Sequence, residues 1–143
     1  MIEPGIIAEV MGGVAVLGHR LNSLPALSRA VAGGLPKQAL KKTALRVYPI
    51  SSDATRLIYR VVPEATYKRR TRLTAAESER TERLARVVAA AESVWDDRDD
   101  ARRWLTTSLR ELNGKTPVES AMTELGARQV EELLDRIFYG LPA

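Results

Sequence analysis

The sequence contains no cysteine and a single histidine, His19, among its 143 residues. Disulfide bonds and thiolate metal sites are therefore excluded, and one histidine without a second ligand nearby in sequence is far more often a surface residue than a metal site. No run of eighteen apolar residues occurs, and residues 1–5 show no positive region followed by a long apolar run, so we expect no signal peptide. We therefore expect a cytoplasmic protein that holds no metal and does not bind a membrane.

Catalytic motifs are also missing from the chain. No glycine-rich phosphate loop precedes a helix, no Gly-x-Ser-x-Gly turn is present, and there is no cysteine nucleophile. The carboxylates within residues 77–82 and 131–135 fall opposite apolar stripes, where solvation is their expected role. We expect no enzyme, no cofactor and no small-molecule substrate.

The charge of the chain is distributed unevenly. Residues 1–72 contain 12 Lys and Arg against 4 Asp and Glu, which gives +8, whereas residues 73–143 contain 10 against 14, which gives −4; the sum is the net +4. A basic half joined to an acidic half is common where one end meets a polyanion and the other a protein. Two solvated surfaces of different sign would explain the same pattern.

Apolar residues recur at helical spacing along most of the chain, with no convincing strand pattern, so we expect an all-α protein of seven to nine short helices. Residues 14–17 fit a helix or a strand, and we favour a helix. Ser23 is expected to cap a helix over residues 24–32, with Leu24, Leu27 and Val31 facing inward. Pro36 then opens a helix whose lysines, Lys37, Lys41 and Lys42, form a basic outer face.

The longest apolar stripe begins after Thr74-Ala75-Ala76-Glu77, a sequence typical of a capping box. It runs from Leu84 to Trp95 and predicts the central helix of the protein. The aspartates within residues 96–100 lack the spacing of a calcium loop, so we interpret them as helix-capping and solvated residues. Both tryptophans lie on apolar stripes and are expected to anchor the core.

A second capping box, Thr116-Pro117-Val118-Glu119, starts a helix that we expect to end near Gly126. A further helix would then carry Val130, Leu133, Leu134, Ile137 and Phe138 on one core-facing stripe and end at Gly140. The remaining Leu141, Pro142 and Ala143 are apolar and have little chain left with which to bury themselves. Such a tail suggests a binding partner.

Residues 52–73 form a candidate helix-turn-helix motif. Ser51 or Ser52 is expected to cap the first short helix, and a break at residues 61–63 separates it from a second helix that carries Lys68, Arg69 and Arg70. In such a motif the second helix lies in the major groove and its cations neutralise phosphates. The turn lacks the usual glycine, and a solvated basic surface is the alternative interpretation.

From residue 63 onward the order of short motifs resembles that of the Xre-type antitoxins of the Xre/MbcA/ParS group, which accompany RES-domain toxins. The motifs that carry the resemblance are Pro63-Glu64-Ala65-Thr66, Arg69-Arg70, Leu73-Thr74-Ala75-Ala76-Glu77-Ser78-Glu79-Arg80, Leu84-Ala85-Arg86-Val87, Ala101-Arg102-Arg103-Trp104-Leu105, Leu112-Asn113-Gly114-Lys115-Thr116-Pro117 and Arg136-Ile137-Phe138-Tyr139-Gly140.

The resemblance implies two regions, a helix-turn-helix-like DNA-binding region at residues 1–73 and a helical toxin-binding region at residues 74–143. Antitoxins of this group neutralise NAD-degrading RES toxins by placing the C-terminal helix and tail against the entrance of the toxin's active site. On this sequence the implied toxin-binding residues are Arg136, Phe138, Tyr139, Gly140, Leu141, Pro142 and Ala143.

Family members also repress their own operon, usually as homodimers, so the resemblance implies operator DNA as a second partner. The implied DNA-binding residues are Thr66, Lys68, Arg69 and Arg70. Two alternatives remain: a dimeric helix-turn-helix transcription factor without a toxin partner, whose acidic half serves only for dimerisation, and an interaction scaffold that binds no DNA.

Overall fold

A computed structural model describes residues 2–140 of the protein, and within these residues all regular structure is helical. An isolated bridge between Pro36 and Arg72 is the one β-type pairing in that range. The predicted all-α class is confirmed. The elements are α1 (Pro4–Val10), α2 (Gly13–Leu17), α3 (Leu24–Gly33), α4 (Lys37–Val47), α5 (Ser51–Val61), α6 (Glu64–Arg69), α7 (Ala75–Trp95), α8 (Arg98–Leu105), the 3-10 helix η1 (Arg110–Leu112), α9 (Pro117–Ser120) and α10 (Glu124–Phe138).

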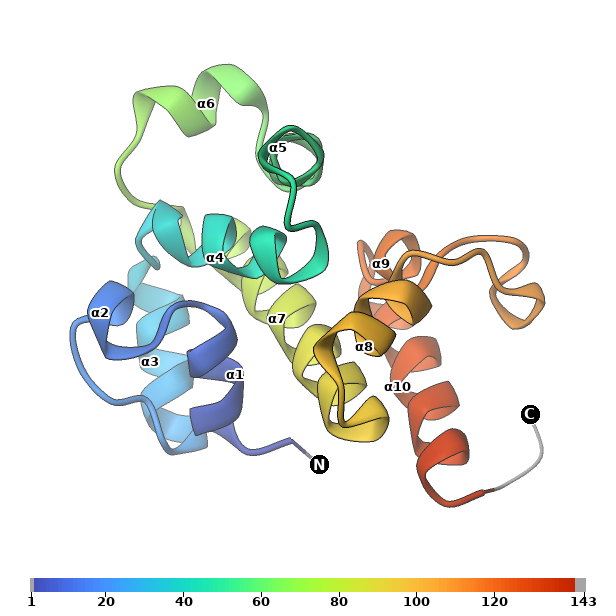
Figure 1. Cartoon of the computed structure of the whole chain (residues 1–143). Helices are drawn as coiled ribbons and strands as arrows, with labels where there is room; N and C mark the ends of the chain where they lie inside the picture. The colour runs from blue at the N-terminus through green and yellow to red at the C-terminus, as the bar shows by residue number, and fades with distance from the viewer. Residues whose placement is uncertain (1, 141–143) are drawn as a thin grey trace.

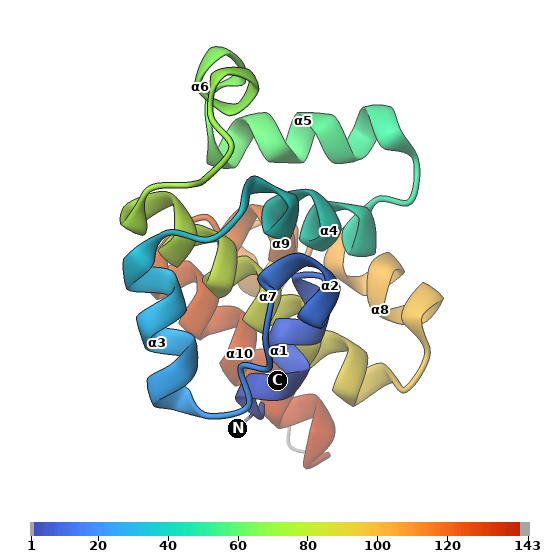
Figure 2. The ribbon, with the colours of Figure 1, turned by 90° about the vertical axis from the view of Figure 1, so that its left-hand side faces the viewer.

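Helix α7 is the central element, as its stripe predicts. Its N-terminus is closed by the predicted capping box, in which Thr74 accepts from the Glu77 amide and the Glu77 carboxylate accepts from the Thr74 amide. The helix packs against α1, α3 and α4 on one side and against α8 and α10 on the other (Figures 1 and 2). Its fully buried side chains include Leu84, Val87 and Val88.

The N-terminal helices follow the predicted pattern with two exceptions. Residues 14–17 lie in helix α2, and Ser23 caps α3 by accepting from the Ala26 amide. The expectation for Leu24 is wrong, because this side chain is 67 % exposed whereas Leu27 is buried. Leu24 is the first residue of α3, directly after the Ser23 cap. Lys37 is half-buried rather than part of an outer basic face.

The helix that begins after Pro49 starts without a side-chain cap. Ile50 occupies the N-cap position, so neither Ser51 nor Ser52 caps the helix, contrary to our expectation. Ser51 is already the first helical residue, and its carbonyl oxygen accepts from the Thr55 hydroxyl. The predicted inward stripe of this helix, which consists of Ala54, Leu57, Ile58 and Val61, is buried.

Helix α8 and the tryptophans join α7 near its C-terminus. Asp97 caps α8 by accepting from the Asp99 and Asp100 amides, as the capping interpretation predicts. The rings of Trp95 and Trp104 lie 6.4 Å apart, and both pack against the core. The aromatic pair therefore fastens α8 to the end of α7.

The break between the last two helices lies earlier than we expected. Helix α9 ends at Ser120, and Thr123 caps α10 by accepting from the Gly126 amide, so Gly126 lies in the first turn of α10 and does not end a helix. A Cβ atom at Gly126 would overlap the carbonyl oxygen of Ser120. The glycine therefore allows the two helices to approach closely at this corner.

Ion pairs also join α10 to α7. Arg86 contacts Glu82 on its own helix and Glu131 on α10, each at 3.2 Å, and Arg83 contacts Glu124 at 3.3 Å. Burial raises the pKa of the Glu82 carboxyl, and Arg86 opposes this rise. Within residues 2–140, no helix is long and apolar enough to cross a membrane.

Candidate functional site

The two segments that the sequence singles out lie at different ends of the molecule. Helix α6 stands outside the main body next to α5, and the last turn of α10 extends beyond the body at the opposite end (Figures 1 and 2). They are therefore two separate candidate sites.

Helices α5 and α6 form the predicted helix-turn-helix arrangement. Val62 and Pro63 are extended and connect the two helices, and α5 packs on α4. Proline at this position is tolerated because the first amides of a helix have no partner within the helix. Helix α6 has no fully buried residue, and of its side chains only Tyr67 packs, partly buried, against the core.

Side-chain contacts with α4 and α5 hold α6 around Tyr67. The Lys37 ammonium of α4 donates to the Tyr67 carbonyl oxygen at 2.9 Å and lies 4.8 Å from the centre of the Tyr67 ring. The Tyr59 ring of α5 meets the Tyr67 ring edge to face at 6.1 Å. Burial raises the pKa of the Tyr67 hydroxyl, and Tyr59 adds to this rise. Tyr67 is thus turned toward the body of the protein.

The C-terminal end of α6 is held by an ion pair. The Arg70 guanidinium donates to both oxygens of the Glu77 carboxylate, at 3.2 and 3.4 Å. The same carboxylate completes the capping box of α7, and its side chain is only 9 % exposed. Arg70 thus connects the candidate recognition helix to the start of the central helix.

The other predicted DNA-binding residues have different surroundings. Lys68 is exposed and pairs with Glu64 one turn earlier, and the hydrogen bond to Glu64 raises the pKa of the Lys68 ammonium. Arg69 is exposed and makes no ion pair within the part of the chain that the structure describes. Thr66 is half-buried. The assignment of Thr66, Lys68, Arg69 and Arg70 to DNA stays a prediction.

The supporting roles of Lys37 and Glu77 were not predicted from the sequence. Lys37 lies 30 residues before Tyr67, and Glu77 was recognised only as a capping residue. No pattern of neighbouring residues predicts these contacts, because they form only when α4, α6 and α7 pack together.

The second candidate site is the end of α10. Val130, Leu133 and Leu134 are buried against the core, but Ile137 is 41 % exposed and Phe138 61 % exposed, so our expectation that these two residues face the core is wrong. The reason is geometric, since the last turn of α10 extends past the helices that cover the earlier turns (Figure 1).

The exposed turn ends in adjacent aromatic rings. Tyr139 is 73 % exposed, and its ring centre lies 5.0 Å from that of Phe138. Arg136 is also exposed, and Gly140 ends the helix with φ +67°. The predicted toxin-binding residues Leu141, Pro142 and Ala143 lie outside the described residues. The assignment of this set to a toxin stays a prediction.

Comparison with protein families identifies both regions. Residues 26–86 match the antitoxin Xre-like helix-turn-helix domain, and residues 90–140 match the antitoxin Xre/MbcA/ParS C-terminal toxin-binding domain. The first match ends and the second begins within α7, so this helix contributes to both. The predicted division between residues 73 and 74 stays a prediction.

Individual relatives agree with these matches. A protein named Antitoxin Xre from Pseudomonas putida is 37 % identical over 84 residues, which cover 56 % of this chain and 53 % of the relative. A protein of the same name from Yersinia enterocolitica is 36 % identical over 71 residues, 49 % of this chain and 48 % of the relative. The alignments span about half the length of these curated relatives. Because the two domain matches follow one another from residue 26 to residue 140, the chain belongs to the Xre-type antitoxins of the Xre/MbcA/ParS family.

Proposed function

We propose that this chain is the antitoxin of a type II toxin–antitoxin system and that it neutralises an NAD-degrading RES-domain toxin. In this proposal the end of α10 and residues 141–143 cover the entrance of the toxin's active site. The observation that carries it is the exposure of Ile137, Phe138 and Tyr139 at the end of a helix whose earlier turns are buried. The protein acts in the cytoplasm by binding alone.

The chemistry of the α10 end supports this role. Aromatic side chains bury a large area and lose little conformational entropy when they are fixed, which is why they are frequent binding hot spots. The turn that carries Phe138 and Tyr139 continues a helix anchored by Leu133 and Leu134, so binding does not have to order it from a disordered state. Arg136 adds an exposed cation beside the aromatic pair.

We further propose that the protein represses its own operon as a homodimer, with α6 in the major groove of the operator. Arg69 is exposed and has no carboxylate partner in residues 2–140, so it can bind a DNA phosphate without breaking an ion pair within the protein. Lys68 would exchange Glu64 for a phosphate. Arg70 would have to share its charge between DNA and Glu77.

The proposal is tested by co-expressing the chain with the RES-domain toxin candidate from the neighbouring gene while cellular NAD is followed. Full-length protein should preserve NAD, and a variant without residues 138–143 should not. Melting of the purified truncated protein should stay close to that of the full-length protein, because Phe138 and Tyr139 are exposed and bury no core surface.

Two outcomes would overturn parts of the proposal. A truncated protein that still preserves NAD would remove the α10 end from the inhibitory surface. If NAD does not fall even without this chain, the partner is not an NAD-degrading toxin, and a dimeric helix-turn-helix transcription factor without a toxin partner becomes the better description.

A further inference from the structure

A groove of about 770 Å³ lies between α3 and α10, which both pack on α7. Helix α3 contributes an apolar wall that consists of Leu24, Leu27 and Val31, and Ile2 and Ile7 add to the apolar lining. Leu24 is 67 % exposed, and Val31 is half-buried. Apolar side chains that are exposed together in a groove are typical of a surface that another protein covers.

The other side of the groove is formed by charged residues of α7 and α10. Most of these charges are compensated within the protein by the ion pairs that join the two helices. Arg86 pairs with Glu82 and with Glu131. Arg83 pairs with Glu124. These groups hold α10 on α7, so they already have a role in the fold.

Two further charged residues of the groove, Glu79 on α7 and Arg128 on α10, have no ionic partner within residues 2–140. Both are exposed. A two-fold axis through an interface brings residue i of one copy to residue j of the other copy, and residue j of the first to residue i of the second. A groove that carries one anion and one cation, both available, is therefore complementary in charge to a second copy of itself.

The position of the groove also suits a dimer that binds DNA. Figure 2 shows α3 and α6 toward the same side of the molecule, with α6 at its upper end. A two-fold axis that runs beside α3 toward this upper end would place α6 of both copies at one end of the dimer. Dimeric helix-turn-helix repressors need this arrangement, because their two recognition helices bind half-sites one helical turn apart.

We propose that a second copy of this chain covers the groove, so that a dimer forms about a two-fold axis between the two α3–α10 surfaces. This inference rests on the homodimer proposed above and assigns its surface. In the dimer, Leu24 and Val31 of each copy are buried against the partner. Glu79 of one copy pairs with Arg128 of the other, and this contact occurs twice in each dimer.

The first experiment measures the dissociation constant of the dimer by sedimentation equilibrium of the full chain at low salt. Glu79→Arg and Arg128→Glu should each raise this constant by about tenfold or more, because either change turns two attractive contacts into repulsive ones. The double variant Glu79→Arg/Arg128→Glu should return it to within about threefold of the unmodified value, because the two reversed charges again attract each other. Restoration is expected only if the two residues meet across the interface.

The apolar wall is tested by a second substitution. Leu24→Ala should raise the dissociation constant by about tenfold, because this exposed side chain is buried only in the dimer. The matched control is Ile50→Ala, which removes a side chain of similar exposure, 64 %, that does not line the groove. The control should dimerise as the unmodified chain does. Circular dichroism shows that each variant keeps its helical fold.

The possible results separate this inference from the proposed homodimer. Equal dissociation constants for the unmodified chain, both single charge reversals and Leu24→Ala would show that the dimer uses another surface, which overturns the inference and leaves the homodimer intact. Failure of the double reversal to restore dimerisation would reject the pairing of Glu79 with Arg128. An unmodified chain that stays monomeric would overturn the homodimer together with this inference.

Discussion

Helix α6 and the last turn of α10 both extend from the body of this protein, but they are supported in opposite ways. Helix α6 buries no residue and is held by Lys37, Tyr59 and the Arg70–Glu77 ion pair. The last turn of α10 has no such side-chain supports within residues 2–140 and continues a helix whose earlier residues are packed in the core.

Because of this difference, we expect the two elements to respond differently to amino-acid substitutions. Side-chain supports can be removed one at a time, so the orientation of α6 should be adjustable at little cost in global stability. The last turn of α10 is held by the packing of the earlier turns of the same helix. Substitutions at its exposed residues should therefore cost little stability, whereas substitutions at the buried residues of the earlier turns should cost much more.

The largest effect is expected where the α10 anchor is removed. Leu134 is 1 % exposed, and Leu134→Ala should lower the free energy of unfolding by about 2–5 kcal/mol because it leaves a cavity between α10 and the core. Ile137→Ala, one turn later on the same helix, should cost well under half as much. Urea unfolding checks both, and similar losses would show that the two turns are anchored alike.

A smaller loss is expected at the corner between α9 and α10. Gly126→Ala places a methyl group against the Ser120 carbonyl oxygen and should cost about 1–3 kcal/mol in unfolding free energy. Gly33→Ala is the matched control, since no atom lies within 4 Å of the position that its methyl group would take. It should be neutral or slightly stabilising. Equal stability of the two variants would mean that the close approach at Gly126 is not needed.

The supports of α6 should affect DNA binding more than folding. Lys37→Met removes the hydrogen bond to the Tyr67 carbonyl and should weaken operator binding by about two- to tenfold relative to Lys41→Met, an exposed lysine on the same helix. Both variants lose one charge, so their salt slopes should agree. Equal operator affinities in a binding titration would show that Lys37 does not position α6.

The smallest effect concerns the ion pairs between α7 and α10. The folded pKa of Glu82 is raised, chiefly by burial, so its contribution to stability is present below the unfolded value of 4.5 and is lost as pH rises through the folded pKa. In the Glu82→Gln variant this side chain cannot ionise, so the variant does not lose this stability as the pH rises. The difference in unfolding free energy between variant and unmodified protein should therefore shift in favour of the variant from pH 4 to pH 7. A shift in the other direction would indicate that the Arg86 contact dominates.

The elements that the sequence predicted correctly are those defined by local chemistry. The capping boxes at Thr74 and Thr116, the cap at Ser23 and the stripe of α7 depend on residues three or four positions apart. The expected caps at Ser51 or Ser52 and the expected burial of Leu24 failed at helix starts, whereas two other errors arose where helices pack together. Gly126 does not end a helix but allows α10 to approach the Ser120 carbonyl closely. Ile137 and Phe138 are exposed, contrary to expectation, because the last turn of α10 extends past the helices that pack against its earlier turns.

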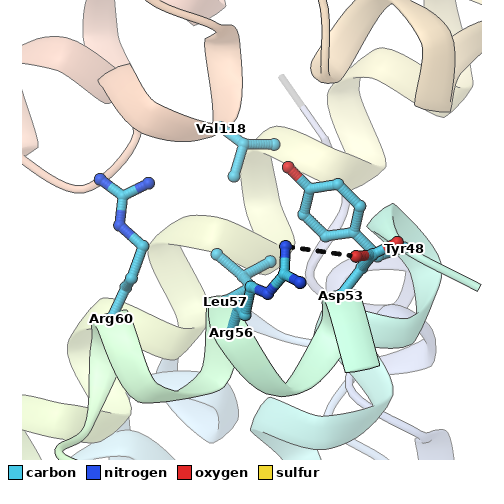
Figure 3. Close-up of a pocket in the computed structure, with 6 residues that line it drawn as sticks. All are labelled: Tyr48, Asp53, Arg56, Leu57, Arg60 and Val118. Atoms are coloured by element: carbon cyan, nitrogen blue, oxygen red, sulfur yellow. Dashed lines mark ion pairs between the residues drawn. The ribbon is translucent and has the colours of Figure 1, made fainter. Parts of the chain in front are cut away.

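The candidate sites show the same limit. The sequence placed Arg69 and Arg70 together as cations of one short helix, yet only the packing of α6 beside α7 brings Arg70 to Glu77. A hollow between α5 and α9 is likewise lined by side chains from residues 48–60 and by Val118, which are separated by almost half of the chain (Figure 3).

The most direct test of the inhibitory role of the α10 end compares inhibition of the purified RES-domain toxin by two variants of this helix. Phe138→Ala/Tyr139→Ala removes the exposed aromatic pair, and Leu125→Ala removes an equally accessible apolar side chain from the other end of the same helix. We expect the double variant to inhibit NAD degradation about a hundredfold less well, while Leu125→Ala inhibits as the unmodified protein does. Full inhibition by the double variant would contradict the assignment of the aromatic pair to the toxin-blocking surface.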